Sequence, residues 1–97
     1  MDVLFLSTAY PPEMQEYARG LAEVGARVFG VGDSPASALP ARLRRVLDEY
    51  LQVPHILDEE DVIERVSRRL GRWRPDRVET LWEPLVVAAA RLREAIG

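Results

Sequence analysis

The sequence contains no cysteine, no lysine and no asparagine among its 97 residues. Without cysteine, the chain has no disulfide, no thiolate metal site and no cysteine nucleophile. All 13 basic residues are arginine, which we interpret as coding bias of the genome, with a thermophilic source as the weaker interpretation. No apolar run approaches the roughly 18 residues that a membrane span needs, and the acidic start has too short an apolar stretch for a signal peptide. These features predict a cytoplasmic protein with no membrane partner.

The charge balance argues against nucleic acid as a partner. The chain has 13 basic and 16 acidic side chains, so its net charge is −3, which gives no general attraction to a polyanion. The densest charge cluster, residues 58–77, holds six Arg around Trp73 but also six acids. The acids crowd the start of a predicted helix and the Arg residues its end, which complements the helix dipole. We therefore favour a solvated helix and expect no nucleic-acid partner.

A glycine-rich nucleotide loop is also missing. A dinucleotide fold would show G-x-G-x-x-G after the first apolar run, because its backbone N–H groups bind pyrophosphate. This chain has Ala9-Tyr10-Pro11-Pro12 at that place, and the two prolines have no N–H to donate. Walker and G-x-S-x-G motifs are absent as well. With a single His and no thiol, we predict no transition-metal site in this chain.

What the sequence does contain is a regular alternation of short apolar runs and amphipathic segments. The apolar runs predict strands at Val3–Leu6, Val28–Val31, Glu49–Val53 and Asp76–Trp82. Helices are predicted from Met14 to Ala22, from Ala41 to Leu47, from the Asp58 cap to Leu70, and from Pro84 onward. Strands joined by helical crossovers run parallel. Residues 1–97 are therefore predicted to form one α/β domain, a small Rossmann-like three-layer fold with a four-stranded parallel sheet in the order 3-2-1-4.

In such a sheet, ligands bind at the carboxyl ends of the strands. The order 3-2-1-4 places the switch point between strands 1 and 4, so the first loop would face Trp82 and Glu83 across a crevice. Glu is a poor helix cap compared with Ser, Thr, Asp or Asn. For Glu83, contact with a ligand and a structural capping role are therefore equally favoured. The candidate substrate-binding residues are Tyr10, Pro11, Pro12, Gly32, Asp33, Trp82 and Glu83.

Two residues at this edge, one of them the candidate Asp33, have plainer interpretations. Asp33 precedes Ser34-Pro35, and a turn stabilised by its own side chain is favoured over ribose binding, because the nucleotide glycines are missing. His55 lies in the predicted Pro54–Asp58 loop and is interpreted as a solvent-facing loop residue.

The last predicted helix is unusual in its composition. Its stretch "LVVAAA", Leu85–Ala90, is apolar all round, and such a helix is normally buried on more than one side. One face of a sheet cannot cover it. We therefore expect Leu85, Val86, Val87 and Ala90 to contact another domain or a second copy of the chain.

Two family resemblances compete. "VLFLSTAYPPEMQEYARGLAEVGARV" resembles the start of GT-B glycosyltransferases, where a strand leads through a Tyr-Pro-Pro loop into a helix. Those enzymes usually carry a Gly-Gly pair just after Pro-Pro-Glu, and this chain has Met14-Gln15 there. The resemblance ends at about Val31 and implies half of a glycosyltransferase.

The second resemblance spans the whole chain. "LAEVGARVFGVGD", "YLQVP" and above all "DRVETLWEPLVVAAARLREAIG" resemble the N-terminal domain that precedes the ATP-grasp fold in the biotin carboxylase and carbamoyl-phosphate synthetase large-chain group. The resemblance implies ATP-dependent ligation, in which a carboxylate is phosphorylated and a nucleophile then displaces phosphate. By analogy, the carboxyl-edge loops form the substrate side of the cleft for a small carboxylate. Glu83, the acidic residue after strand 4, is the best match.

The same resemblance implies what this chain leaves to another domain. ATP and Mg²⁺ are expected to bind an ATP-grasp domain, which is absent from residues 1–97, and this chain itself is expected to hold no cofactor. The predicted partner is that domain, on the same or a separate chain. We accordingly expect residues 1–97 alone to be inactive. A stand-alone homo-oligomeric interaction domain and a glycosyltransferase half remain the alternatives.

Overall fold

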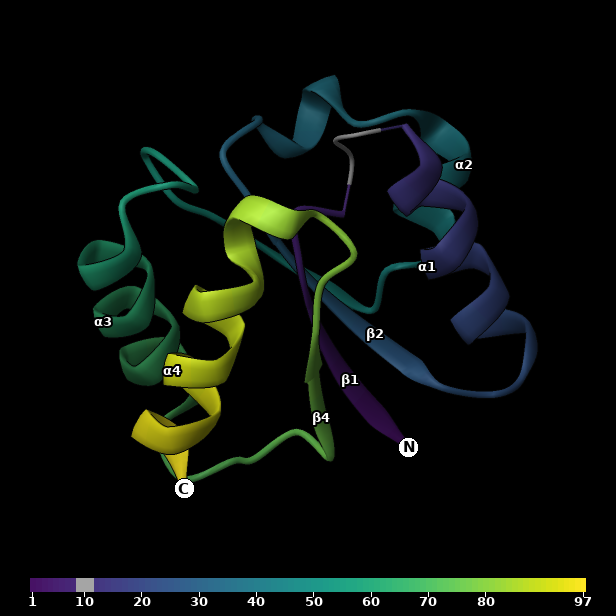
Figure 1. Ribbon diagram of the computed structural model, residues 1–97. Coiled ribbons are helices and arrows are strands. Elements are labelled where there is room, and N and C mark those ends of the chain that lie inside the picture. The colour runs from purple at the N-terminus through teal and green to yellow at the C-terminus, as the bar shows by residue number, and fades with distance from the viewer. Residues whose placement is uncertain (9–11) are drawn as a thin grey trace.

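The computed structural model describes residues 1–8 and 12–97. The elements follow the chain as β1 (Asp2–Leu6), α1 (Glu13–Glu23), β2 (Arg27–Gly32), the 3-10 turn η1 (Ala36–Ala38), α2 (Ala41–Val46), β3 (Glu49–Gln52), α3 (Glu59–Leu70), β4 (Arg77–Glu79), the 3-10 turn η2 (Glu83–Leu85) and α4 (Val86–Ile96). The four strands are all parallel, in the order β3-β2-β1-β4 (Figure 1). The predicted fold class and strand order are confirmed.

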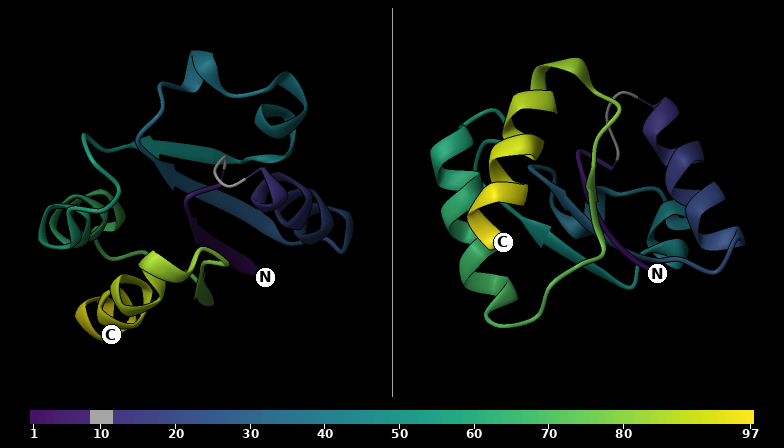
Figure 2. Two further views of the ribbon diagram at one scale, coloured as in Figure 1. Left: turned by 45° about the horizontal axis from the view of Figure 1, so that its top comes forward. Right: turned by 60° about the horizontal axis from the view of Figure 1, so that its bottom comes forward.

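The helices cover both faces of the sheet. Helices α1 and α2 lie on one face, and α3 and α4 lie side by side on the other (Figures 1 and 2). Because strand side chains alternate between the faces, β1 contributes Leu4 and Leu6 to the core under α3 and α4, and Phe5 to the core under α1 and α2. The strand is therefore buried on both sides, as the unbroken apolar run of residues 3–6 predicts.

Helix ends follow the sequence signals closely. Asp58 caps α3, since its side chain accepts a hydrogen bond from the Asp61 N–H at 3.3 Å. Gly25 and Gly71, just past α1 and α3, have φ angles of 88° and 57°, which glycine adopts without strain. The longest described helix has 12 residues, and within residues 1–8 and 12–97 none combines the length and hydrophobicity of a membrane span.

Two boundaries differ from the prediction. The fourth strand was expected to run from Asp76 to Trp82, but β4 ends at Glu79. The Thr80 hydroxyl donates to the Leu6 carbonyl at 3.0 Å, and this side-chain bond replaces the strand ladder. Likewise, Pro84 does not open an α-helix; it lies in the 3-10 turn η2, and α4 begins at Val86.

The charged residues of α3 pair with one another, as the solvated-helix interpretation expects. Arg65 contacts Asp61 at 2.8 Å, and Arg68 pairs with Glu64 one turn earlier. Arg91 of α4 contacts Glu59 and Glu60 at 2.6 Å each. These side chains are largely exposed, so each pair contributes little free energy on its own. The acids lie at the start of α3, and the pairs with Arg91 join α3 to α4.

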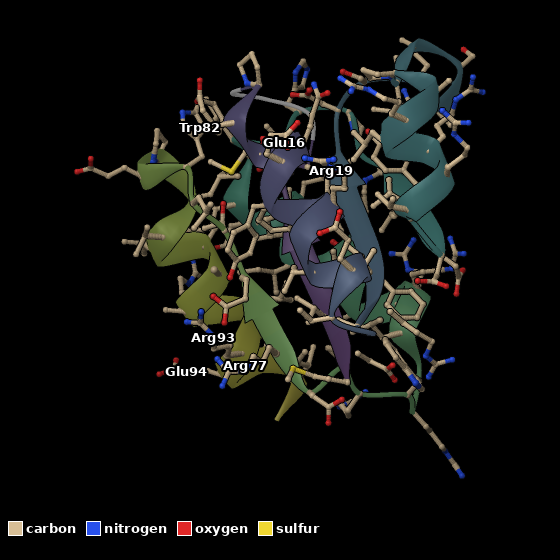
Figure 3. The ribbon with its side chains drawn as sticks, turned by 90° about the vertical axis from the view of Figure 1, so that its right-hand side faces the viewer. Glu16, Arg19, Arg77, Trp82, Arg93 and Glu94 are labelled. Atoms are coloured by element: carbon tan, nitrogen blue, oxygen red, sulfur yellow. The ribbon has the colours of Figure 1, made fainter. Side chains whose placement is uncertain are left out.

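The outer edge of β4 is occupied by a side chain. Within residues 1–8 and 12–97, β4 has β1 as its single neighbouring strand. Arg93 of α4 donates to the Val78 carbonyl through Nε at 3.1 Å and through its terminal nitrogen at 2.6 Å. Figure 3 shows Arg93 and Arg77 at the lower part of this edge, well away from Trp82. The edge carbonyl is thus hydrogen-bonded without a fifth strand.

An ion pair joins the starts of β1 and β2. Asp2 and Arg27 are opposite each other in the parallel ladder, and Arg27 donates to both carboxylate oxygens, at 2.7 and 2.8 Å. This two-bond geometry is the strong form of an arginine–carboxylate contact. The hydrogen bond from Arg27 is the largest cause that lowers the pKa of the Asp2 carboxyl from its ordinary 3.8.

This pair predicts a pH-dependent contribution to stability. Because the pKa of Asp2 is lower in the folded chain, its contribution is complete above its ordinary 3.8 and is lost as the pH falls through the folded pKa. We expect Asp2→Asn to lower the urea midpoint at pH 7 and to lower it less at pH 3, where part of the contribution is already lost. Urea titrations of both chains at both pH values check this. An equal difference at the two pH values would contradict it.

Candidate functional site

A cavity of about 210 Å³ lies at the carboxyl edge of the sheet. Its described lining comes from the segments that follow all four strands: Ser7 after β1, Asp33 after β2, His55, Ile56 and Leu57 after β3, and Trp82 after β4. Parallel strands end at one edge of a sheet, which is why segments so distant in sequence converge here. The edge combines one carboxylate, one imidazole and one large aromatic ring.

Ser7 enters this edge in an uncommon conformation. Its φ is 62°, the one positive φ of a non-glycine residue within residues 1–8 and 12–97. The Ser7 N–H donates to the Val31 carbonyl at 2.7 Å, which holds the backbone as it leaves β1. Residues held in the left-handed region cost free energy and concentrate at functional sites. The strain thus coincides with the cavity.

Asp33 links two of the loops at the cavity. Its Oδ2 accepts a hydrogen bond from the Ile56 N–H at 3.1 Å, across 23 residues of sequence. One residue earlier, the Gly32 carbonyl accepts from the Val53 N–H at 2.8 Å. These two bonds fix the loop after β3 against the loop after β2. The interpretation of Asp33 as a turn residue did not predict its bond with the Ile56 N–H. That bond holds the Asp33 carboxylate in place on the cavity wall.

Tyr50 lies against two glycines of β2. A Cβ on Gly32 would approach the Tyr50 hydroxyl to 2.7 Å, and a Cβ on Gly30 would approach the ring to 3.2 Å and the Thr8 side chain to 3.0 Å. The Tyr50 hydroxyl donates to the Ser34 carbonyl at 2.7 Å. Burial, followed by the nearby Asp33 carboxylate, raises the pKa of Tyr50 above its ordinary 10. The phenol therefore stays protonated and tethers the loop after β2.

Trp82 and Glu83 differ in their placement. Trp82 is half-buried, lines the cavity and packs against the cores on both faces of the sheet. The Trp82 backbone N–H donates to the Thr80 hydroxyl at 3.3 Å, and that hydroxyl in turn donates to the Leu6 carbonyl. Glu83 is exposed at the first position of η2, next to Trp82. The Trp82 ring thus forms a wall of the cavity, whereas Glu83 is not among the described lining residues.

The structure brings together some of the predicted site residues and separates others. Asp33 and Trp82 line the cavity. Gly32 is buried beneath Tyr50 and provides space for that ring. Pro12 is exposed just before α1, and the predictions for Tyr10 and Pro11 fall outside the described residues.

Sequence reasoning missed His55 as a site residue. His55 is exposed, as expected for a loop residue, but it also lines the cavity. The signal was its position between a parallel strand and the following helix, on the same edge as Asp33. Ser7 had no signal, since serine seldom adopts a positive φ.

The predicted docking residues of the last helix divide into two groups. Leu85 is only 2% exposed and belongs to the chain's own core, so it is not available to a partner. Val86 and Val87 are 52% and 64% exposed, and Ala90 is also exposed. Leu81, just before Trp82, is 51% exposed. In the sequence these exposed apolar residues lie on both sides of Trp82, which lines the cavity.

The described residues do not fit a magnesium–nucleotide site. Among residues 1–8 and 12–97, no group of three or more His, Cys, Asp or Glu could hold a metal ion. The chain also has no lysine to contact phosphates. What the described lining offers is a small, mostly apolar cavity with an aromatic wall, one carboxylate and one imidazole.

The chain is thus a small parallel Rossmann-like α/β domain with a cavity at the carboxyl edge of its sheet. No family profile matches the sequence, and no curated protein matches it. The fold is similar to that of glycinamide-RNase-transformylase T from Mycobacterium tuberculosis, with a TM-score of 0.66 and 29% sequence identity. The match covers 97% of this chain and 24% of that one, so this chain spans about a quarter of the length of the enzyme it resembles.

That transformylase is an ATP-grasp enzyme, and the match is consistent with an N-terminal domain of that kind. The resemblance to an N-terminal domain of ATP-grasp proteins is thereby confirmed. The match supports a part of such an enzyme.

The contact between Gly32 and Tyr50 yields a testable coupling. Gly32→Ala places a Cβ where the Tyr50 hydroxyl lies, and we expect it to lower the free energy of unfolding by about 1–3 kcal/mol, the usual cost of overpacking. In a Tyr50→Phe background the same substitution should cost much less, because the hydroxyl is gone. Urea unfolding of the four chains measures this double-mutant cycle. An identical cost in both backgrounds would contradict the contact.

Proposed function

We propose that this chain is the substrate-side N-terminal domain of an ATP-dependent carboxylate ligase of the ATP-grasp type. The observation that carries the proposal is the cavity formed by the ends of all four strands, in a fold similar to an ATP-grasp enzyme. ATP and Mg²⁺ would bind another domain, which would convert the substrate carboxylate into an acyl phosphate. A nucleophile would then displace the phosphate. The part played by this chain is to bind and orient the substrate.

The chemistry of the lining suggests which end of the substrate it meets. Of the described lining residues none is Arg, and the one formal charge is the Asp33 carboxylate. An anionic carboxylate or phosphate gains little in such a cavity. Asp33 is suited to accept hydrogen bonds from a hydroxyl or an amine, and the Trp82 ring offers a flat apolar wall. We therefore propose that the substrate carboxylate points away from this cavity, towards the ATP-binding domain.

The apolar surface beside the cavity supports the second half of the proposal. Val86, Val87 and Leu81 are each more than half exposed and lie close in sequence to Trp82, which lines the cavity. Contiguous exposed apolar residues mark interaction surfaces more often than chance. In our proposal the ATP-grasp domain packs here, on the same or a separate chain, and closes the cavity into a cleft. A homo-oligomer through the same helix is the alternative occupant.

Glu83 provides the kinetic test of the proposed substrate role. In a full-length ATP-grasp protein that carries this domain, we expect Glu83→Gln to lower kcat/KM for the carboxylate substrate about 10- to 100-fold, or about 1.4–2.7 kcal/mol of transition-state stabilisation. KM for ATP should not change. A coupled assay of ADP release measures both. Glu94→Gln is the matched control, since Glu94 is an exposed Glu near the other end of α4. If both variants behave like the parent enzyme, Glu83 has no substrate role.

Val87 provides the test of the docking surface. Val87→Glu places a charge on the exposed start of α4, and we expect it to weaken association with the ATP-grasp domain at least tenfold. Val24→Glu is the control, because Val24 is 81% exposed at the end of α1, on the opposite face of the sheet. Sedimentation of the mixed domains measures association. Self-association of the chain alone that Val87→Glu abolishes would favour the homo-oligomer instead.

A further inference from the structure

A second cavity, of about 130 Å³, lies between α3 and the β2–β3 half of the sheet. It shares no described lining residue with the carboxyl-edge cavity. Its floor is made by side chains of three neighbouring strands, Leu4, Val31 and Leu51, and its roof by Val66 and Leu70 of α3. The two cavities are therefore separate sites, and the use of this one does not depend on the proposed ligase function.

Two aromatic rings form one end of this cavity. Phe29 of β2 and Trp73, just after α3, have ring centroids 4.6 Å apart and planes tilted by 54°. Both residues are half-buried and line the cavity. Tilted and offset arrangements are the ones that aromatic rings prefer, so the pair can receive a third ring at its edge.

The charged groups at the cavity satisfy each other. Arg69 of α3 forms an ion pair with Glu49 at the start of β3, and both side chains are about half exposed. The pair lies at the solvent side of the lining. The Tyr50 hydroxyl, from the neighbouring lining residue, is engaged by the Ser34 carbonyl. The charges at the rim are thus already paired, and the interior surface is predominantly hydrocarbon.

We propose that this cavity binds one small, flat, apolar molecule of the size of a single aromatic ring. An engineered cavity of about 150 Å³ lined by Leu, Ile and Phe takes up benzene, and this one, which is open to solvent on one side, has a similar volume and a mostly apolar lining. Unfilled apolar volume lowers the stability of a core in proportion to its size, so an apolar occupant stabilises the fold. The charges of Glu49 and Arg69 already satisfy each other, so the pair offers an ionic ligand little attraction.

The two tryptophans of the chain make the proposal directly testable. Trp73 lines this cavity and Trp82 lines the carboxyl-edge cavity, so each reports on one site. We expect fluorobenzene, titrated into the ¹⁵N-labelled 97-residue chain, to shift the Trp73 indole N–H signal saturably and to leave that of Trp82 in place. Trp82→Phe assigns the two signals. The ¹⁹F line of the ligand should broaden in parallel.

Filling variants decide whether the signal comes from the cavity. Val66→Phe adds volume at the roof, and we expect it to weaken fluorobenzene binding at least tenfold. Ile63→Phe is the matched control, because Ile63 lies one turn earlier on α3 and does not line the cavity. Leu51→Phe, at a half-buried position on β3, replaces Val66→Phe if that chain fails to fold. Absence of a saturable Trp73 shift, equal shifts of both tryptophans, or undiminished binding in a folded filling variant would each overturn the proposal.

Discussion

All four strands run in one direction, and most of the architecture follows from that constraint. Each connection must cross a face of the sheet, so the three connections between strands are helical crossovers and the sheet is covered on both faces. The two interior strands, β1 and β2, are accordingly the most buried. The constraint also brings four loops to a single edge. The carboxyl-edge cavity exists because of this convergence rather than because of any local motif.

The sequence allowed the fold to be predicted almost completely. The apolar runs, the Asp58 cap and the glycines after α1 and α3 are local signals, and the structure places each where these signals indicate. The errors arose where a long-range contact overrides local propensity. The bond from Thr80 to Leu6 joins residues 74 positions apart and ends β4 three residues before the predicted boundary. No local pattern contains that information.

The site was predictable only at the level of loops. The rule for parallel sheets brought Asp33 and Trp82 to the correct edge, and both line the cavity. It could not tell a lining residue from a supporting one. Gly32 supports the site because Tyr50 needs the space, and that contact depends on the register in which Gly30 pairs with Tyr50. Register is a property of the assembled sheet, so the role of Gly32 emerges only from the structure.

The hydrogen bonds from Arg93 to the Val78 carbonyl have a consequence for behaviour at high concentration. Open sheet edges are templates on which a second chain can add its own strand, and this is a common start of aggregation. Here one edge offers a carbonyl that already accepts two bonds from a guanidinium. The opposite edge, β3, is only four residues long and carries the Glu49 carboxylate paired with Arg69. Charged side chains thus occupy both edges of the sheet. Arginine is present at each edge and opposes the addition of further strands and fibril-like growth.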